Sequence, residues 1–299
     1  MFETLIVQPI FNLLVLIYAL LPGHDFGISV IIFTVLVRFL MWPLLKKQLH
    51  QTKLMRDLQP DVKRIKERTK GDRQQEAALL MELYKERGVS PFGSIGLLFL
   101  QLPILLGLFQ GLSRLADEPQ TIVDLSYDGV LNLDWMQTIS ADISRFDETL
   151  LGVVDLTRNA FGDGGFYFPA FTLALAAGLF QYFQTKQLSP NTGDSRTIRQ
   201  ILKDEANGKR SDQSEINAAM GRNMRYIFPF LTFIISASLP GALALYWATG
   251  SLVGTLQQRS VLNTDVEEME AVADKASAPA KRPKPAKPKA KSTKKKRRR

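Results

Sequence analysis

Long apolar segments, separated by charged ones, dominate the pattern of this chain. Residues 26–45 form a twenty-residue apolar run with a single charge, Arg38. Two further runs, residues 95–113 and 166–183, contain no charged residue. A helix rises 1.5 Å per residue, so about 20 residues cross the ~30 Å hydrocarbon core of a bilayer. Each of the three runs therefore predicts a membrane-spanning helix.

Charged residues are distributed unevenly over the connecting segments, which indicates how the chain is oriented. Residues 46–90 contain twelve Lys and Arg residues, and residues 184–225 contain eight. Residues 115–165 contain only two, against ten acidic residues. Short cytoplasmic connections retain Lys and Arg, so the first two segments are predicted to be cytoplasmic and the third extracytoplasmic.

The last apolar run, residues 226–256, has 31 uncharged residues and is too long for one upright span. One kinked helix and two short helices would both accommodate it. Arg225 precedes the run and Arg259 follows it, so both ends are predicted to be cytoplasmic. The run must then turn back near Pro240 and Gly241. This gives five spans, with the N-terminus outside and the C-terminus inside.

The predicted fold class is all-α: a polytopic membrane protein with a five-helix transmembrane core, a cytoplasmic antiparallel helical hairpin and a disordered basic C-terminal tail. The predicted segments are an outer-face interfacial helix over residues 1–25; spans over 26–45, 94–114, 166–184, 223–239 and 240–259; the hairpin over 46–93; an extracytoplasmic loop over 115–165; a cytoplasmic loop over 185–222; and the tail over 260–299.

Residues 4–21 are apolar but contain Gln8, Pro9 and Asn12. As a spanning helix they would place Met1 inside, yet no Lys or Arg precedes residue 38 to hold it there. They also lack the positive start of a cleavable signal peptide. We favour an interfacial helix on the outer face, and a spanning helix remains open.

The charged segment from residue 48 to residue 87 has helical periodicity on both sides of a break at Gly71 and Asp72. Two antiparallel helices that pack together would form the hairpin; a solvated connector is the alternative. The apolar positions expected to face one another are Leu54, Leu58, Val62 and Ile65 on one arm and Ala78, Leu79, Met81, Leu83 and Tyr84 on the other.

Residue types for catalysis are scarce in this chain. It has no cysteine and two histidines, which excludes disulfides and thiolate metal sites and disfavours a histidine-based metal or triad site. Neither a phosphate-binding loop nor a nucleophile elbow is present, and residues 162–165 indicate a turn. We therefore expect no enzyme, cofactor or metal.

Arg38 is the unusual residue of the predicted spans. Lys46 follows eight residues later, which places Arg38 about 12 Å inside the cytoplasmic end of a straight helix. An arginine that reaches back to the headgroups, helped by Trp42, is one interpretation. The other is a cation that faces a wet cavity between helices, because no Asp or Glu lies in any span. An anion channel or transporter would fit the second interpretation too.

Several motifs together resemble the YidC/Oxa/Alb family of membrane protein insertases. They cover about residues 4–262 in order: RFLMWPL from Arg38, MRDLQP from Met55, LYKE from Leu83, VSPFG from Val89, FLQLPI from Phe99 and LPGALALYW from Leu239. The resemblance implies a five-helix core, an interfacial first helix and a cytoplasmic hairpin. Ser90 before Pro91 and residues 248–250 in the last span depart from the family pattern.

The resemblance also implies a function and a site. The family inserts and folds nascent membrane proteins in a hydrophilic groove open to the cytoplasm and to lipid, and Arg38 matches its groove arginine. Thr34 and Trp247 match substrate-contacting positions, and Gln101 occupies the polar position of the second span. The implied partners are nascent membrane proteins and the Sec translocon, and the absence of a large extracytoplasmic domain and of a transit sequence suggests a bacterial plasma membrane.

The net charge of +9 comes from the C-terminal end. Residues 281–299 contain twelve Lys and Arg residues, whereas the other 280 residues contain 26 basic and 29 acidic ones. Such a tail cannot build a core and binds polyanions, either anionic lipid or ribosomal RNA. The family resemblance favours the ribosome. The candidate binding residues are Lys294, Lys295, Lys296, Arg297, Arg298 and Arg299.

Overall fold

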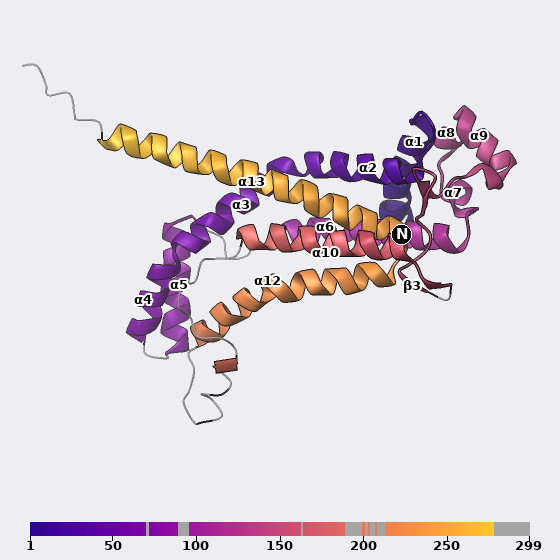
Figure 1. The fold of residues 1–299 in the computed structure, drawn as a ribbon. Coiled ribbons are helices and arrows are strands. Elements are labelled where there is room, and N and C mark those ends of the chain that lie inside the picture. The colour runs from indigo at the N-terminus through magenta and orange to yellow at the C-terminus, as the bar shows by residue number, and fades with distance from the viewer. Residues whose placement is uncertain are drawn as a thin grey trace, which may run out of the picture. The chain divides into compact units, whose positions relative to one another are not determined.

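The computed structural model describes residues 1–69, 72–88, 96–162, 164–188, 199, 200, 203, 207 and 213–277 (Figure 1). The described chain is predominantly helical, so the predicted all-α class is confirmed. Residues 1–262 form one compact unit and residues 263–299 a second one.

Most elements are helices, and the strands are two residues long. The helices are η1 (Glu3–Val7), α1 (Gln8–Leu20), α2 (Phe26–Leu40), α3 (Trp42–Asp57), α4 (Gln59–Thr69), α5 (Arg73–Glu86), α6 (Gly96–Asp117), α7 (Thr121–Asp124), α8 (Asp128–Leu131), α9 (Asp134–Ala141), η2 (Ile143–Arg145), α10 (Phe168–Leu188), α12 (Gln213–Ser238) and α13 (Gly241–Ser277). The strands are β1 (Thr149–Leu150), β2 (Val154–Asp155), β3 (Phe161–Gly162) and β4 (Gly165–Phe166). They pair as two antiparallel ribbons, β1 with β2 and β3 with β4.

The first apolar segment is a continuous helix, η1 followed by α1. Within the described residues it is the one unbroken helix, Glu3–Leu20, that is both long and apolar enough by itself to cross a membrane. Its residues Phe11, Leu14 and Tyr18 are buried against the rest of the unit. Such burial also suits a helix that lies on the bundle, so the preference for an interfacial helix stays a prediction.

The first predicted span, residues 26–45, is bent. Helix α2 ends at Leu40 and α3 begins at Trp42, with 58° between α2 and the Trp42–Met55 part of α3. Pro43 lacks an amide hydrogen and restricts the residue before it, which favours a break at this point. Because the helix is not straight from Arg38 to Lys46, the depth of about 12 Å estimated for Arg38 from a straight helix is too large.

The other predicted spans coincide with helices α6, α10, α12 and α13. Helix α12 ends at Ser238 and α13 begins at Gly241, so the long apolar run is divided between two helices at the position where the turn was predicted. Helix α13 continues to Ser277, so the predicted start of the disordered tail at residue 260 is too early. Glu and Ala are the commonest residues of 266–277 and favour a helix, and Pro279 is the first proline beyond it.

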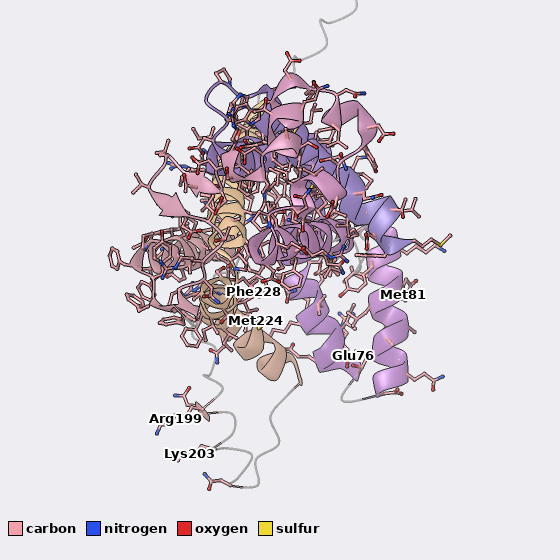
Figure 2. The ribbon with its side chains drawn as sticks, turned by 90° about the vertical axis from the view of Figure 1, so that its right-hand side faces the viewer. Glu76, Met81, Arg199, Lys203, Met224 and Phe228 are labelled. Atoms are coloured by element: carbon pink, nitrogen blue, oxygen red, sulfur yellow. The ribbon has the colours of Figure 1, made fainter. Side chains whose placement is uncertain are left out.

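The predicted hairpin is formed by α3 and α4 on one arm and α5 on the other, and α4 packs against α5. Asp72 caps α5, because its Oδ1 accepts hydrogen bonds from the amides of Gln74 and Gln75. Leu58 is buried as predicted. Met81 of α5 (Figure 2) is 64% exposed. Ala78 is exposed too, so the predicted packing of both residues is wrong. The partly buried face of α5 instead carries Leu79, Leu80, Leu83 and Tyr84.

The extracytoplasmic loop was predicted over residues 115–165; the described residues of 118–166 form a folded region that we call the cap. It contains α7, α8, α9, η2 and both ribbons. Ile122, Met136 and Ile139 of the cap are fully buried in the same apolar cluster as Phe11 of α1 and Phe33 of α2. The cap thus shares one core with the helices.

Backbone hydrogen bonds join the cap to the turn between α12 and α13. The amides of Gly241 and Ala242 donate to the carbonyls of Arg158 and Leu156, both at 2.9 Å. The amide of Ala160 donates to the carbonyl of Ala237 at 3.0 Å. This strand-like contact holds the turn, and with it the first residues of α13, in a fixed position.

Candidate functional site

Helix α2 presents Thr34 and Arg38 on one face, one turn apart. Thr34 is buried, and its hydroxyl donates to the carbonyl of Val30 at 2.6 Å. Arg38 is partly buried. Within the described residues no carboxylate forms an ion pair with its guanidinium. Among the described residues, Arg38 is therefore a partly buried cation without a carboxylate partner.

Two glycines of α13 make room for this guanidinium. A Cβ atom built on Gly250 would lie 3.1 Å from Nη2 of Arg38, and one built on Gly254 would lie 3.1 Å from Nη1. Both separations are shorter than ordinary carbon–nitrogen contacts, so an alanine at either position would force the guanidinium to move. The spacing Gly-x-x-x-Gly allows close approach of two helices, and here it receives a cationic side chain.

Amide side chains surround the arginine. Gln184 of α10 lies beside Gly254, because its Nε2 would be 2.5 Å from a Cβ built there. Gln257 of α13 donates from Nε2 to the backbone carbonyl of Arg38 at 3.0 Å. The buried Oε1 atoms of Gln257 and Gln258 have no hydrogen-bond partner within the described residues. Gln257, which contacts the backbone of Arg38, therefore retains an unused acceptor among the described residues.

Further hydrogen bonds tie α10 to α13 beside this lining. The hydroxyl of Ser251 donates to Oε1 of Gln181 at 3.0 Å. Thr255 donates to the carbonyl of Phe180 at 3.5 Å. Three helices distant in sequence, α2, α10 and α13, thus meet at Arg38.

The two other predicted site residues, Gln101 and Trp247, lie on α6 and α13. Gln101 of α6 donates from Nε2 to the hydroxyl of Tyr246 at 2.9 Å, and that buried tyrosine is an electrostatic neighbour of Arg38. Trp247 is partly buried and packs against the apolar core. The structure brings Arg38 and Thr34 together, connects Gln101 to them through Tyr246, and places Trp247 on the same helix with apolar contacts.

Sequence reasoning did not find five residues of this arrangement: Gln184, Tyr246, Gly250, Gly254 and Gln257. The Gly-x-x-x-Gly spacing in an apolar helix was a usable signal. The basic tail residues Lys294 to Arg299 lie outside the described residues. Within the part of the chain that is described, no group of three His, Cys, Asp or Glu residues could hold a metal ion.

Comparison with known proteins identifies the family. A family model described as the 60Kd inner membrane protein matches residues 17–268, which include Arg38, its glycines and all surrounding amides. The chain belongs to this family, the YidC/Oxa/Alb family. Membrane protein insertase YidC of Fusobacterium nucleatum is 30% identical over 80% of this chain and 86% of that protein. Membrane protein insertase MisCA of Bacillus subtilis is 26% identical over 88% of this chain and 80% of its own length.

Membership in this family bears on the fold and on the cellular compartment. The predominantly helical structure fits an integral membrane protein of the YidC/Oxa/Alb family, as the motifs predicted. Relatives from several bacteria, including membrane protein insertase YidC of Clostridium tetani, match 78% of this chain or more at 26–30% identity. The chain is an integral cell-membrane protein.

Proposed function

We propose that this protein inserts nascent integral membrane proteins into the bilayer and assists their folding. The observation that carries the proposal is the family match over residues 17–268, supported by relatives named membrane protein insertases. An anion channel built on Arg38 was the alternative from sequence, and the names of the relatives do not favour it.

The proposed site is a hydrophilic groove around Arg38, open to the cytoplasm and to lipid. An unpaired cation in a low-dielectric surrounding attracts an acidic segment of a substrate. The amides of Gln184 and Gln257 lie beside it and can bind water or the substrate backbone. Once the polar segment has crossed, the apolar span of the substrate moves sideways into lipid. Its burial supplies the free energy, since each buried CH₂ contributes about 0.8 kcal/mol.

The other proposed substrate-contacting residues have different tasks. Because the hydroxyl of Thr34 is already bonded to Val30, Thr34 contributes shape rather than a free donor. Gln101 holds the hydroxyl of Tyr246, and Trp247 offers an aromatic ring to an apolar span. Photo-crosslinkers at Thr34 and Trp247 should capture a stalled nascent chain if these residues line the path.

Reconstitution with a small single-span substrate carrying an acidic outer segment tests the role of Arg38. Arg38→Ala should lower insertion, while Arg38→Lys should retain much of it, because a point charge suffices without bidentate geometry. A substrate with an uncharged outer segment is the matched control and should respond little. Full insertion of the acidic substrate by Arg38→Ala would remove the electrostatic mechanism, and a solute flux that depends on Arg38 would favour a channel.

We also propose the five-span topology in a bacterial plasma membrane, with the N-terminus outside and the C-terminus cytoplasmic. Helices α2, α6, α10, α12 and α13 would be the spans, and the cap would lie outside. The chain has no native cysteine, so single cysteines can report on topology. A membrane-impermeant maleimide should label Asp128→Cys in intact cells and label Lys85→Cys only after lysis; the reverse pattern would invert the topology.

The hairpin of α3, α4 and α5 is proposed to receive the substrate or the Sec translocon. The pairing of α4 with α5 and the capped start of α5 make it an ordered unit. Deletion of residues 54–85 should lower insertion and leave the thermal unfolding of the membrane part unchanged. Wild-type insertion by this deletion would leave the hairpin with the role of a connector.

The basic tail is proposed to bind ribosomes through ribosomal RNA. Twelve cations within residues 281–299 neutralise phosphates without reading sequence, so binding should weaken steeply as salt rises. Truncation after Ser277 should abolish cosedimentation with ribosomes at low salt. If the truncated protein in detergent sedimented with ribosomes as the full chain does, the tail would be assigned to anionic lipid.

A further inference from the structure

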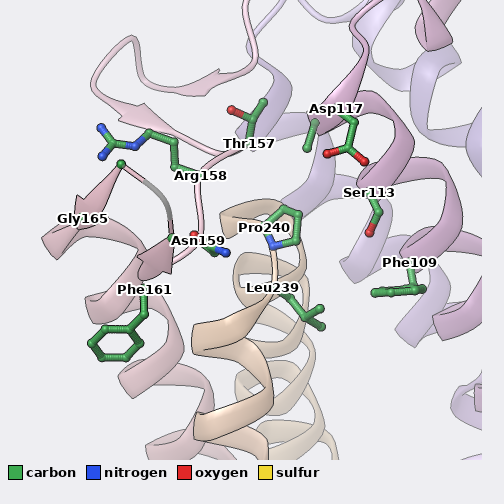
Figure 3. Close-up of a pocket in the computed structure, with 13 residues that line it drawn as sticks. Phe109, Ser113, Asp117, Thr157, Arg158, Asn159, Phe161, Gly165, Leu239 and Pro240 are labelled. Atoms are coloured by element: carbon green, nitrogen blue, oxygen red, sulfur yellow. The ribbon is translucent and has the colours of Figure 1, made fainter.

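A cavity of about 500 Å³ lies where α6 ends, between that helix, the cap and the turn from α12 to α13 (Figure 3). It is separate from the site at Arg38, and none of the groove residues lines it. The hydrogen bonds from Gly241 and Ala242 to the cap fix the turn that forms one of its walls. The cavity thus lies between α6, the cap and a turn that is hydrogen-bonded to the cap.

The lining changes from apolar to charged along the axis of α6. Phe109, Ser113 and Asp117 follow one another at four-residue spacing and line the cavity in that order. Across the cavity, Leu239 lies at the level of Phe109, and Arg158 lies at the level of Asp117 on the opposite wall, with its guanidinium turned away from Asp117 (Figure 3). A ligand that fills this space needs an apolar part and a polar part that carries charge.

The side-chain charges of Asp117 and Arg158 have no charged partner within the described residues. Asp117 is exposed at the C-terminal end of α6, where the helix dipole disfavours a negative charge. Arg158 stacks its guanidinium on the ring of Tyr167, 4.2 Å from the ring centre, which leaves its N–H groups free to donate. Neither residue forms an ion pair in the described part of the chain, although both line the same cavity.

The apolar end of the cavity continues onto an exposed apolar surface of α6. Phe109 is 37% exposed, and Leu106 and Leu102, further along α6, are 44% and 39% exposed. Exposed large apolar side chains on a membrane helix face acyl chains. An acyl chain can therefore leave the cavity along α6 without crossing a polar surface.

We propose that this cavity binds one phospholipid with a zwitterionic headgroup that carries a primary amine. Arg158 binds the phosphate, Asp117 accepts hydrogen bonds from the ammonium group, and Phe109 with Leu239 contacts the glycerol end of the acyl chains. In the proposed topology the cap lies outside, so this lipid would belong to the outer leaflet. The binding itself does not depend on the topology. An anionic glycerol headgroup satisfies Arg158 and leaves Asp117 facing a negative charge, so it should bind more weakly.

Native mass spectrometry of the delipidated full-length protein tests the proposal, with dioleoyl-phosphatidylethanolamine and dioleoyl-phosphatidylglycerol as probes. The wild type should bind one molecule of the first lipid about tenfold more tightly than the second, which is the equivalent of one charge-assisted contact. Asp117→Asn should abolish this preference. Arg158→Gln should weaken binding of both lipids.

Two further variants separate lipid binding from altered folding. Arg145→Gln removes an exposed cap arginine that lies outside the cavity lining and should bind both lipids as the wild type does. Ser113→Trp fills the cavity without changing a charge and should prevent binding of either lipid. Equal affinity of the wild type for the two lipids, or undiminished binding by Ser113→Trp, would overturn the proposal. Lipid binding is measured without insertion activity. The lipid site can therefore be confirmed even if the proposed insertase function is wrong.

Discussion

Asn12, where α1 meets the cap, is a buried polar side chain with all its hydrogen-bonding groups used, whereas the polar groups facing Arg38 are only partly used. The amide of Asn12 donates to the carbonyls of Gln8 and Leu125, both at 2.8 Å. Its oxygen accepts from the amide of Tyr127 at 2.6 Å. At Arg38 the guanidinium lacks a carboxylate among the described residues, and the Oε1 atom of Gln257 lacks a donor.

The same contrast holds at the two ends of α2. At its start, Asp25 caps the helix through the amide of Ile28 at 2.7 Å and also accepts from the amide of Leu151 in the cap. Near its end, Arg38 lies against bare glycine backbone. A fully satisfied polar network stabilises one structure, and a partly satisfied one leaves capacity for water and ligands. The cap end of α2 has its polar groups paired, and the Arg38 end keeps polar groups without partners among the described residues, as the proposed groove requires.

The largest expected effect is on the stability of the cap end. Asn12→Leu should lower the free energy of unfolding by roughly 3 kcal/mol, because it leaves the carbonyl of Leu125 and the amide of Tyr127 buried without partners. Asn132→Leu changes an exposed asparagine of the cap and is the matched control. Thermal unfolding in detergent, followed by intrinsic fluorescence, measures both. Equal melting temperatures for the two variants would contradict a structural role of Asn12.

The helices and the unusual position of Arg38 could be predicted from local sequence. The contacts that distinguish the two ends of α2 could not. The helices follow from apolar runs, and Arg38 was identifiable because a charge in such a run is rare. Its glycine contacts join α2 to residues more than 200 positions later, and no periodicity relates the two segments. From the sequence, Asn12 counted as a polar residue that disfavours a spanning helix; two of its three partners, Leu125 and Tyr127, lie in the cap, more than 100 residues away.

Two local errors have equally specific causes. The predicted hairpin face of α5 combined Met81 with Leu79 and Leu83 and left out Leu80, yet consecutive residues are 100° apart, so one partner helix cannot cover all three of the residues that it combined. The bend at Met41 follows from Pro43, which was included in a continuous span because its neighbours are apolar. In both cases apolar residues correctly indicated a helix. Which face of α5 is buried depends on its packing partner, and where the first span bends depends on the backbone at Pro43.

A smaller effect is expected at the glycines of α13. Gly254→Ala should displace the guanidinium of Arg38 and lower insertion of the acidic substrate about threefold to tenfold, which is 0.7–1.4 kcal/mol. The decisive measurement is a double-mutant cycle, because Gly254→Ala should lower insertion less when Arg38 is already Ala, when only its crowding against Gln184 is left. Gly107→Ala introduces a similar crowding, 2.8 Å from Cδ1 of Ile10, away from Arg38, and serves as control. Additive losses would mean that Gly254 acts only through helix packing.

The smallest expected effect has the opposite sign to that of Asn12→Leu. Arg38→Met removes a partly buried cation that lacks an ion-pair partner in the described chain and replaces it with an apolar side chain of similar length. Desolvating such a charge costs free energy, and no ion pair among the described residues offsets it. The variant should therefore be as stable as the wild type or more stable by about 1 kcal/mol. The same thermal unfolding assay measures this, and insertion of the acidic substrate should fall in parallel. A variant clearly less stable than the wild type would mean that the guanidinium holds α2 to α13, and the distinction between the two ends of α2 would then be lost.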